Sequence, residues 1–558
     1  MLLAACVLAP CFRQVYRANG KPLEDAAAGI ARGEIFLLRR GATAPEITRF
    51  LRPYDDERER RAVAARIADE LVAGAPGTVG ARAAVRPAPG GPRLFGYDEF
   101  ARLKPYFAVR TPADFRAAFR RSLWLFFGAF VLAHLALTLI RFRGDQRLLP
   151  LAFLLSGAGL ALMVSLRDPV RDLMLFTDFA AGVAAACGLL VAICAASHFM
   201  DLRSRGLLPG PAAAAAALDR ASGFARTASR RGNLAFAAAI VLSLLLLAFG
   251  TGPGESGVRV RLWFFQPVEL IRFLLVLFLA SYFASKWEFL RELKEKRIRS
   301  RFDLPRADHA LPVMAAVAIA IAFFFLQKDL GPAVILAGLF LALYAVARVR
   351  IGLVAVALGA LAAVGALAYA IGYPPIAVTR IGMWLSPWNN GLARGEQVVH
   401  ALWAMASGGL FGAGLGGGQP QLIPAAHTDL ILAALAEEGG FAGLAIVVAA
   451  FVFLFARCFR IALRAATEYG FFLSLGLTLA LALEGAFIAG GIAGVLPLSG
   501  VVTPFLSYGS TAMLVNFACL GVLMAVSAKP ARPEPDSRFV RPVRVLAGVL
   551  AAFAVVVV

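Results

Sequence analysis

The run His427-Thr428-Asp429-Leu430-Ile431-Leu432-Ala433-Ala434-Leu435 joins two kinds of sequence. Residues 373–426 before it are rich in Gly, Pro and Trp and contain the run Gly408-Gly409-Leu410-Phe411-Gly412, whereas the residues after it are apolar as far as residue 456. Because lipid cannot satisfy irregular backbone, a Gly- and Pro-rich segment in such a chain lies outside the bilayer or lines a cavity. The sequence therefore predicts that residues 373–438 carry the functional site.

The composition places the chain among polytopic membrane proteins. Of its 558 residues, 60% are hydrophobic and 16% charged, and the mean hydropathy is +0.74, which excludes an ordinary soluble protein. The net charge of +21 comes from Lys and Arg grouped between apolar stretches, so it indicates topology and contact with anionic lipid, with no nucleic-acid partner. The six cysteines form no Cys-x-x-Cys pair, so we expect small buried hydrophobes and neither a disulfide nor a zinc site.

Apolar stretches divide the chain into candidate spans of about 20 residues, the length that a helix needs to cross a bilayer. The twelve stretches are 122–141, 148–165, 176–198, 233–250, 267–285, 309–326, 331–348, 351–372, 430–456, 469–490, 508–527 and 543–558. The segments 199–232 and 287–308 are rich in Arg and Lys and should be cytoplasmic. Alternation then places residues 373–428 on the outer side.

The same alternation predicts an extracytoplasmic location for residues 12–120. That segment is charged and globular in composition, with a solvated helix expected through 55–61 and a Pro/Gly linker at 88–92. Residues 1–10 are apolar but too short to span, so they fit either a signal remnant or part of a helix.

Charged residues near spanning segments are costly and therefore functional candidates. Those expected on the outer side are Glu269, Lys328, Asp329, Arg380, Glu396, His427, Asp429, Glu437, Glu438 and Glu484. Their gathering on one side predicts a cavity open to the outer face.

Asp429 is the strongest of these candidates because it begins an apolar run, where a helix dipole favours its ionised form. Such a carboxylate can accept a proton from a hydroxyl group or hold a divalent cation. In the alternative interpretation, Thr428 and Asp429 merely cap the helix. His427 fits either a metal ligand or proton carrier, or a hydrogen-bonded group that orients its neighbours.

Other candidates also allow a structural explanation. Glu437 and Glu438 cannot both share the helix face of Asp429, and we expect one of them to pair with an arginine. Lys328-Asp329 fits either a polar turn with Asp329 as N-cap or a charged pair facing the cavity. Trp388, like Trp384, is either a residue of the interfacial aromatic belt or a platform for a sugar or lipid headgroup.

Several blocks together resemble the SEDS family, which includes RodA, FtsW and a sporulation homologue. They are Gln266-Pro267-Val268-Glu269-Leu270, Gln327-Lys328-Asp329-Leu330-Gly331, Pro387-Trp388, Ser407-Gly408-Gly409-Leu410-Phe411-Gly412, His427-Thr428-Asp429, Ala436-Glu437-Glu438 and Pro504-Phe505-Leu506-Ser507-Tyr508-Gly509. The resemblance runs from about residue 147 to 529. It implies an all-α SEDS-like core of ten helices at 148–528, with one extra helix at 121–147 and another after the linker in 529–558, and an N-terminal extracytoplasmic segment at 1–120.

The resemblance also implies a function. The chain would be a peptidoglycan glycosyltransferase of the bacterial cytoplasmic membrane, polymerising lipid II at the outer face during elongation or division beside a class B penicillin-binding transpeptidase. Asp429 would be the catalytic residue. The substrate-binding residues would be Arg380, Lys328, Asp329, His427, Thr428, Glu269, Trp388 and Ser507, with Glu437, Glu438 and Glu484 as supporting residues.

Some positions depart from the family's pattern. Ala425 stands where an acidic residue usually follows Pro424, Glu484 occupies what resembles a Gln position, and Arg272 replaces a Lys. Metal use stays open between Mg²⁺ and Mn²⁺, with Asp429 as a candidate ligand. Two alternative functions are a flippase or transporter of lipid-linked precursors, because buried charges also line translocation paths, and a non-catalytic cell-division scaffold.

Overall fold

The computed structural model describes residues 1–51, 56–73, 102–204, 224–252, 259–262, 265–292, 307–349, 352–388, 395–530, 532 and 537–557. Within these residues the chain is mainly helical, with irregular segments at 409–430 and 493–509 and one two-stranded parallel sheet, in which β1 (Phe36–Leu37) pairs with β2 (Phe107–Ala108). The predicted all-α membrane architecture is confirmed. The linker expected at 88–92 lies outside the described residues.

Ten described helices are long and apolar enough to cross a membrane. They are α7 (Pro112–Leu139), α8 (Leu148–Ser165), α9 (Leu175–Ser204), α11 (Phe224–Phe249), α12 (Pro267–Glu292), α14 (Leu330–Arg348), α18 (Ile431–Leu463), α19 (Glu468–Ile492), α20 (Ser510–Ser527) and α21 (Ser537–Val557). The other two expected spans are also helices, but they differ from a simple span. The apolar part of α13 (Ala307–Leu326) is short, and α15 (Gly352–Ile371) bends by 101° into α16 (Pro375–Leu385).

The first spanning helix begins earlier than hydropathy predicted, at residue 112 instead of 122. A capping box fixes this start: Thr111 Oγ1 accepts a hydrogen bond from the Asp114 N–H at 3.2 Å, and the Asp114 carboxylate accepts one from the Thr111 N–H at 2.9 Å. Pro112 follows at the first helical position, where its missing N–H costs nothing. Hydropathy identifies only the apolar part of α7, whereas the capping residues determine where the helix begins.

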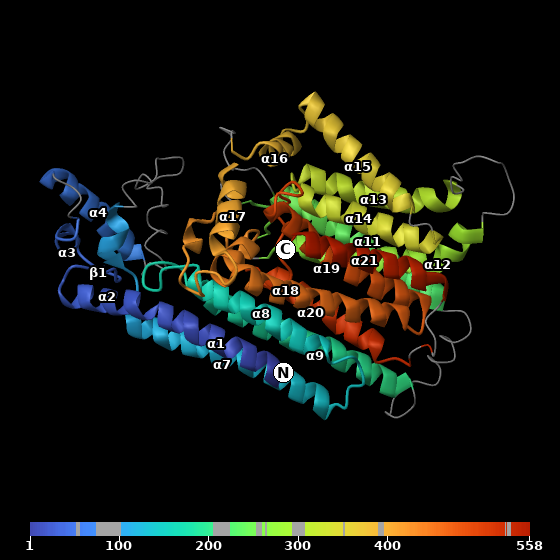
Figure 1. Ribbon diagram of the computed structural model, residues 1–558, viewed down its shortest axis with the longest axis horizontal. Coiled ribbons are helices and arrows are strands. Elements are labelled where there is room, and N and C mark those ends of the chain that lie inside the picture. Colours follow the sequence, from blue (N-terminus) through green and yellow to red (C-terminus); the bar gives the residue numbers. More distant parts are fainter. Residues whose placement is uncertain are drawn as a thin grey trace.

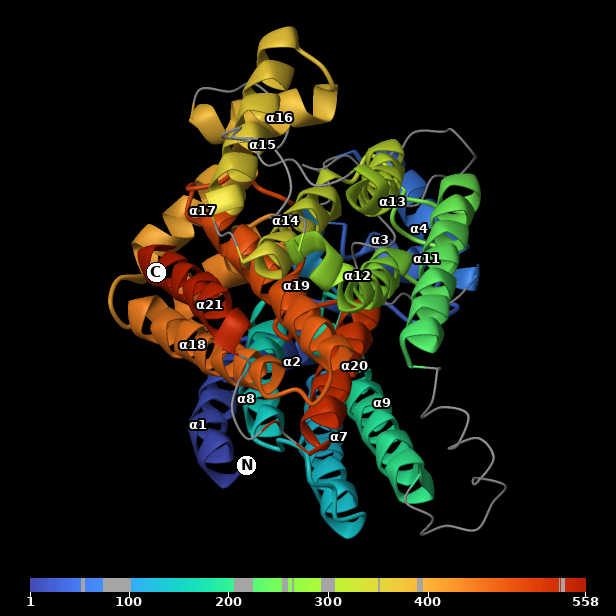
Figure 2. The same cartoon turned by 90° about the vertical axis from the view of Figure 1, so that its right-hand side faces the viewer.

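Helix α19 is the most buried of the spanning helices, and α12, α14, α18, α20 and α21 pack around it. One side of the bundle is formed by α7, α8 and α9, and the opposite side by α13, α14 and α15 (Figures 1 and 2). Another helix, α1 (Leu2–Ala18), packs along α8, with Leu8 against Gly157. Residues 1–10 are thus the first part of α1.

A small unit with its own core precedes α7. We define this N-terminal unit as residues 20–51, 56–73 and 102–110; it includes α2 (Gly20–Ala31), α3 (Ala44–Thr48) and α4 (Glu57–Ala73). Its buried core contains Leu38, Ile47, Leu51, Ile67, Leu71, Leu103 and Phe107. Helix α4 confirms the helix expected from its charged sequence, and its Arg61–Glu57 ion pair is exposed.

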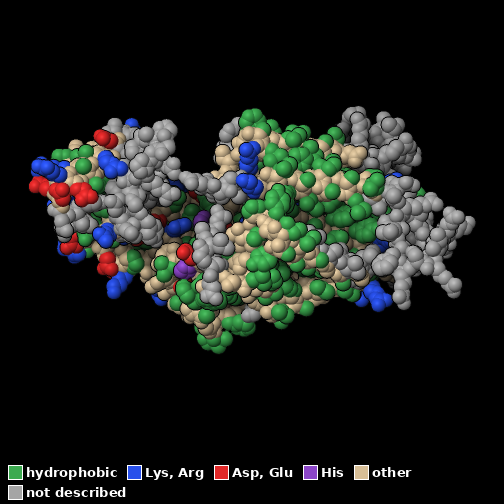
Figure 3. Space-filling model, turned by 90° about the horizontal axis from the view of Figure 1, so that it is seen from above, with side chains coloured by type: hydrophobic (Ala, Val, Ile, Leu, Met, Phe, Trp, Pro, Cys, Tyr) green, Lys and Arg blue, Asp and Glu red, His purple; other side chains and the backbone are tan. Residues whose placement is uncertain are grey.

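The unit lies at the end of the bundle that also carries α16 and α17 (Gly395–Gly408) (Figure 1). Charged side chains gather at that end, while the helical bundle shows a mostly apolar surface (Figure 3). That this end faces outward remains a prediction from the charge of the loops. All six cysteines are free, and four are buried as expected, but Cys6 is exposed and Cys11 half-buried.

Candidate functional site

The segment between α19 and α20 joins several of the sequence blocks. We call residues 493–509 the central loop. On one side of it, Arg380 of α16 donates a hydrogen bond from Nη1 to the Leu498 carbonyl oxygen. Trp384, one turn further along α16, donates from Nε1 to the Gly494 carbonyl oxygen at 2.8 Å. The bent helix α16 is therefore held against the central loop by two side chains.

The start of α14 also meets the central loop, and Gly331 makes this contact sterically feasible. A Cβ atom at Gly331 would lie 2.6 Å from the Ser499 carbonyl oxygen, closer than real Cβ contacts. Because glycine has no Cβ, the two backbones can approach. The central loop therefore lies beside Asp329, the N-cap residue of α14.

The other side of the central loop holds the residues before α18. Ser507 Oγ donates to the Thr428 carbonyl oxygen, and accepts from the Thr503 N–H at 2.8 Å. The Tyr508 N–H donates to the His427 carbonyl oxygen at 2.7 Å. Ser507 thus acts here as a connector between two backbone segments.

Asp429 lies in a turn that precedes α18. The N-cap residue of the helix is Leu430, so Asp429 does not occupy the capping position allowed for by the sequence. The Thr428 hydroxyl lies within hydrogen-bonding distance of Asp429 Oδ1 and of the Ala425 carbonyl oxygen. The Ala425 carbonyl also accepts from the Thr428 N–H at 3.0 Å, with Ala425 in the left-handed region at φ 54°. These bonds orient a half-buried carboxylate at the end of a spanning helix.

His427 lies between charges of opposite sign. Burial and the positive charge of Arg167 lower the pKa of His427 below its usual 6.5, while the negative charge of Asp429 opposes this shift. Its ring centroid lies 6.0 Å from that of Tyr508. His427 therefore favours the neutral form, in which one ring nitrogen can accept a proton.

Tyr508 extends the polar cluster to α9. Its hydroxyl donates to Asp178 Oδ2 at 3.3 Å. Burial and the Asp178 carboxylate raise the pKa of Tyr508, and the positive charge of Arg261 opposes them. Residues from four parts of the chain, namely 167–178, 261, 427–429 and 508, thus share one electrostatic neighbourhood.

Asp329 forms a second polar centre beside the central loop. Its carboxylate is half-buried, and burial raises the pKa of Asp329 to about 6, opposed chiefly by the positive charge of Arg380. Asp329 therefore exchanges a proton near neutral pH, a property suited to acid–base chemistry. The charge that acts on Asp329 thus comes from Arg380 of α16, and Asp329 is also the N-cap residue of α14 that the sequence allowed for. The substrate-binding role of both residues remains a prediction.

Glu269, Arg272 and Glu484 form a buried ion-pair network between α12 and α19. The three side chains are at most 6% exposed; Arg272 contacts Glu269 one turn earlier and Glu484 Oε2 at 2.8 Å. Burying charges is costly unless they are paired. Glu484, which departs from the family's pattern, therefore supplies a second carboxylate to the same guanidinium group, and Glu269 is engaged in this network.

The side chains of Glu437 and Glu438 bind the backbone of residues 416–419, which follow the glycine-rich run 408–412. Glu437 Oε1 accepts from the Gln419 N–H at 2.8 Å, and Glu438 Oε1 from the Gly416 N–H at 3.1 Å. Among the described residues neither glutamate forms an ion pair. Among the described residues the expected arginine partner is therefore not found, and the backbone N–H groups of Gly416 and Gln419 stabilise these carboxylates instead.

Three predicted candidates lie apart from these contacts. Lys328 and Glu396 are exposed. Trp388 is 58% exposed and lies 6.0 Å from Trp403, ring centroid to ring centroid. Both explanations of Trp388, as a belt residue or as a binding platform, stay open.

The residues of the candidate site could bind a divalent cation only together with oxygen atoms of a substrate. No group of three or more His, Cys, Asp or Glu that could hold a metal ion occurs among the described residues. Mg²⁺ is nevertheless often held by one or two carboxylates together with substrate phosphates. Asp429 could contribute to such a site, while a cage made by protein side chains alone has no support.

Sequence reasoning missed four contributors: Arg167, Asp178, Arg261 and the Tyr508 side chain. Asp178 lies near the start of the apolar stretch 176–198, at its predicted outer end, so the rule that selected Asp429 would also have selected it. The arginines lie in short connections whose partners depend on how distant helices pack.

Comparison with known proteins supports the family resemblance of the sequence blocks. Residues 223–531 match the model of the FtsW/RodA/SpoVE family, described as cell cycle proteins. The chain is 33% identical over 285 residues to the peptidoglycan glycosyltransferase RodA of Mycobacterium leprae, covering 50% of this chain and 60% of the relative. It is 32% identical over 294 residues to the probable peptidoglycan glycosyltransferase FtsW of a Geobacter species, covering 51% of this chain and 76% of the relative.

A sporulation protein and a solved structure extend the comparison. Stage V sporulation protein E of Bacillus subtilis is 30% identical over 292 residues, with 51% of this chain and 76% of the relative covered. A structure described as "Structural coordination of polymerization and crosslinking by a peptidoglycan synthase complex" shares the fold, with a TM-score of 0.51 at 22% identity over 69% of this chain and 97% of the other.

The matched region accounts for about three-fifths of the mycobacterial relative's length. It includes the spanning helices from α11 to α20, while the N-terminal unit and α21 lie outside it. The apolar helices and the family match together identify a multi-pass protein of the bacterial cytoplasmic membrane. The chain belongs to the FtsW/RodA/SpoVE family.

Proposed function

We propose that this protein is a peptidoglycan glycosyltransferase that polymerises lipid II at the outer face of the cytoplasmic membrane. The observation that carries the proposal is the pair of polar centres on the two sides of the central loop, with Asp429 on one side and Asp329 with Arg380 on the other. The names of the relatives support the same reaction.

In the proposed reaction, Asp429 accepts the proton of the acceptor sugar's hydroxyl group as that oxygen attacks the donor sugar's anomeric carbon. The bond from this carbon to the diphosphate breaks, and the undecaprenyl diphosphate leaves with the bonding electrons. Positive charges near the leaving group stabilise the transition state. Arg167 and Arg261 beside His427 and Tyr508, and Arg380 beside Asp329, are placed to provide such charge.

We further propose that Mg²⁺ or Mn²⁺ binds with the substrate, held by Asp429 and diphosphate oxygens, and neutralises charge on the leaving group. Chelation by EDTA during the assay tests this. Loss of rate on chelation, restored by adding either ion, would support it; an unchanged rate would contradict it.

A class B penicillin-binding transpeptidase is the proposed partner. The solved structure with the same fold is described as a complex that coordinates polymerisation and crosslinking, which supports this pairing. A flippase or transporter of lipid-linked precursors is the alternative, favoured by the buried Glu269–Arg272–Glu484 network, because charges within spanning helices are typical of translocation paths.

The test is glycan-strand formation from lipid II by the purified protein, with and without the transpeptidase. We expect Asp429→Asn to lower kcat by at least about 100-fold, the usual minimum contribution of a positioned acid or base. Glu468→Gln is the matched control, because Glu468 forms a partly exposed ion pair with Arg532 at the opposite end of the bundle.

Polymer from the wild type and the control, with none from a folded Asp429→Asn variant, would support the proposal. If the wild type makes no polymer with partner and divalent ion present, the enzyme proposal is rejected. Lipid scrambling in liposomes would then identify the transporter, and activity in neither assay would favour the scaffold.

A further inference from the structure

An apolar groove runs along α18 beside α19 and α21. It encloses about 140 Å³. Phe451, Phe455 and Phe459 of α18 form one wall, and Ala547, Ala551 and Ala554 of α21 form another. The spacings of four and three residues place each set on one face of its helix. Three of the α21 residues that face this space are alanines, which leave room between the two helices, while Leu550, Phe553 and Val557 of α21 complete that wall.

The groove is long on the scale of a lipid chain. Its lining includes Leu444 and Phe459 of α18, a separation that corresponds to about 22 Å of helix at 1.5 Å per residue. This exceeds half of the roughly 30 Å hydrocarbon thickness of a bilayer. An extended hydrocarbon chain therefore matches it better than a compact ligand.

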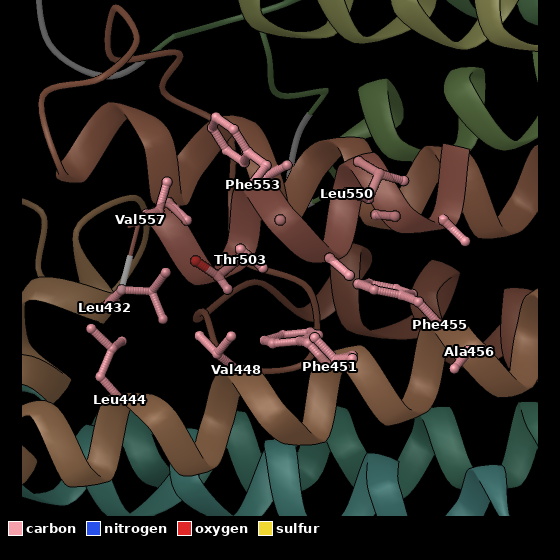
Figure 4. A pocket seen from close by; sticks show the side chains of 18 of the residues that line it. Leu432, Leu444, Val448, Phe451, Phe455, Ala456, Thr503, Leu550, Phe553 and Val557 are labelled. Carbon is pink, nitrogen blue, oxygen red and sulfur yellow. The ribbon is translucent and has the colours of Figure 1, made fainter. Parts of the chain in front are cut away.

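One polar side chain lines this groove, in the half that also carries Leu432. Among its described lining residues, Thr503 carries the one polar side chain. Thr503 is 2% exposed, and its hydroxyl has no hydrogen-bond partner among the described residues. Figure 4 shows Thr503 near Val448, with Leu432, Leu444 and Val557 toward one end of the groove and Phe455 and Ala456 toward the other. A buried hydroxyl without a partner costs free energy, so a ligand oxygen there would be stabilising.

The half of the groove that carries Thr503 adjoins the candidate site. The Thr503 N–H donates to Ser507 Oγ, which donates to the Thr428 carbonyl oxygen next to Asp429. Leu432 follows Asp429 by three residues. An amphiphile in the groove with its polar end at Thr503 would therefore present its headgroup close to Asp429.

We propose that the groove between α18, α19 and α21 binds the isoprenoid chain of the polyprenyl-diphosphate-linked substrate, with Thr503 donating a hydrogen bond to an oxygen at the polar end of that chain. This rests on the proposed function for the identity of the substrate. It assigns a role to α21, which lies outside the family match. The substrate's chain is anchored by a helix additional to the matched core.

The first test fills the groove. Ala551 lines it, whereas its neighbour Ala552 is exposed and does not. We expect Ala551→Phe to raise KM for undecaprenyl-linked lipid II roughly tenfold, equivalent to about 1.4 kcal/mol, and to leave KM unchanged for an analogue with a two-isoprene chain. Ala552→Phe should leave both values unchanged. An equal effect of Ala551→Phe on long and short substrates, or none on either, would overturn the proposal.

The second test is binding without catalysis. Undecaprenyl diphosphate with a diazirine near the end of its chain is photolysed with the full chain in phosphatidylglycerol nanodiscs. We expect labelling of residues 444–459 that Ala551→Phe abolishes and that unlabelled undecaprenyl diphosphate prevents. Thr503→Val should weaken labelling and Thr503→Ser preserve it.

Because this readout needs no glycan synthesis, labelling by a protein that makes no polymer would reject the glycosyltransferase and retain the groove. A diazirine phospholipid that labels residues 444–459 and is not displaced by undecaprenyl diphosphate would instead identify an ordinary bilayer lipid and overturn the proposal. Labelling elsewhere by the polyprenyl probe would also overturn it.

Discussion

His427 joins two parts of the candidate site that are distant in sequence. Its backbone carbonyl is fixed by the Tyr508 N–H, and its ring lies between the charges of Arg167 and Asp429. Because the pKa of His427 responds to both charges, it reports whether the site is assembled. This makes it a useful probe of the geometry even in a variant without activity.

Two substitutions should move the pKa of His427 in opposite directions. Arg167→Ala removes a positive charge that disfavours the imidazolium ion, so the pKa should rise. Asp429→Asn removes a negative charge that favours it, so the pKa should fall. Selective histidine labelling and NMR across a pH titration would measure both, since the chain has five histidines and His427→Gln identifies the signal. Shifts of the same sign would contradict this arrangement.

At the scale of elements, the glycine-rich run 408–412 packs against a break in helix α18, and the backbones of the two segments are hydrogen-bonded to each other. Gly440 interrupts α18 with φ 64° and ψ −168°, a conformation essentially confined to glycine. The Phe441 N–H then donates to the Gly409 carbonyl oxygen at 2.9 Å, instead of completing the helix. The break lets α18 contact the run through its backbone, while Glu437 and Glu438 accept hydrogen bonds from the N–H groups of Gln419 and Gly416 just after the run.

Adding one methyl group to this contact should separate the two elements. A Cβ at Gly408 would lie 1.9 Å from the Ala436 carbonyl oxygen, whereas one at Gly443 of α18 would lie 3.9 Å from Leu435 Cδ1. We expect Gly408→Ala to lower the free energy of unfolding by about 1–3 kcal/mol, and Gly443→Ala to be neutral or slightly stabilising. Thermal unfolding in detergent measures both. Equal midpoints for the two variants would show that the backbones are not in contact.

At the scale of the whole molecule, the N-terminal unit contacts the connection between α8 and α9, which precedes the family match. Arg171, between α8 and α9, donates from Nε to the carbonyl oxygens of Lys104 and Phe107, both at 3.1 Å, and pairs with Asp168 at 2.8 Å. This same connection carries Arg167. A unit outside the family match therefore holds in place a charge that acts on His427.

Removing the Arg171 side chain should affect both the docking of the N-terminal unit and the pKa of His427. We expect Arg171→Ala to destabilise docking of the N-terminal unit by about 2 kcal/mol, to expose residues 102–110 to protease, and to raise the pKa of His427 in the direction expected for Arg167→Ala. Combining the two substitutions should add no further shift of that pKa. Arg32→Ala, which removes an exposed ion pair of the same unit, is the control. Additive shifts would show that Arg171 does not act through Arg167.

The sequence by itself determined the membrane architecture and the end of the bundle that carries the site. Apolar stretches of spanning length can satisfy their backbone only as helices, so all twelve were recognisable. Hydropathy did not fix where the helices end: α11 and α21 begin, and α12 and α18 finish, six to nine residues beyond the apolar stretch, because a helix continues into polar residues outside the hydrocarbon. Asp429, Asp329, Arg380 and His427 were recognisable because ionisable groups beside spanning segments are costly.

Only the tertiary structure decided which of these groups meet. Glu484 reaches Arg272, and Tyr508 reaches Asp178, because helices distant in the sequence pack side by side. Leu430 instead of Asp429 is the N-cap of α18, and backbone N–H groups bind one carboxylate oxygen each of Glu437 and Glu438, because hydrogen-bond partners depend on how the chain folds back on itself. The groove beside α21 arises for the same reason: its two walls come from separate helices, and its shape depends on how they pack.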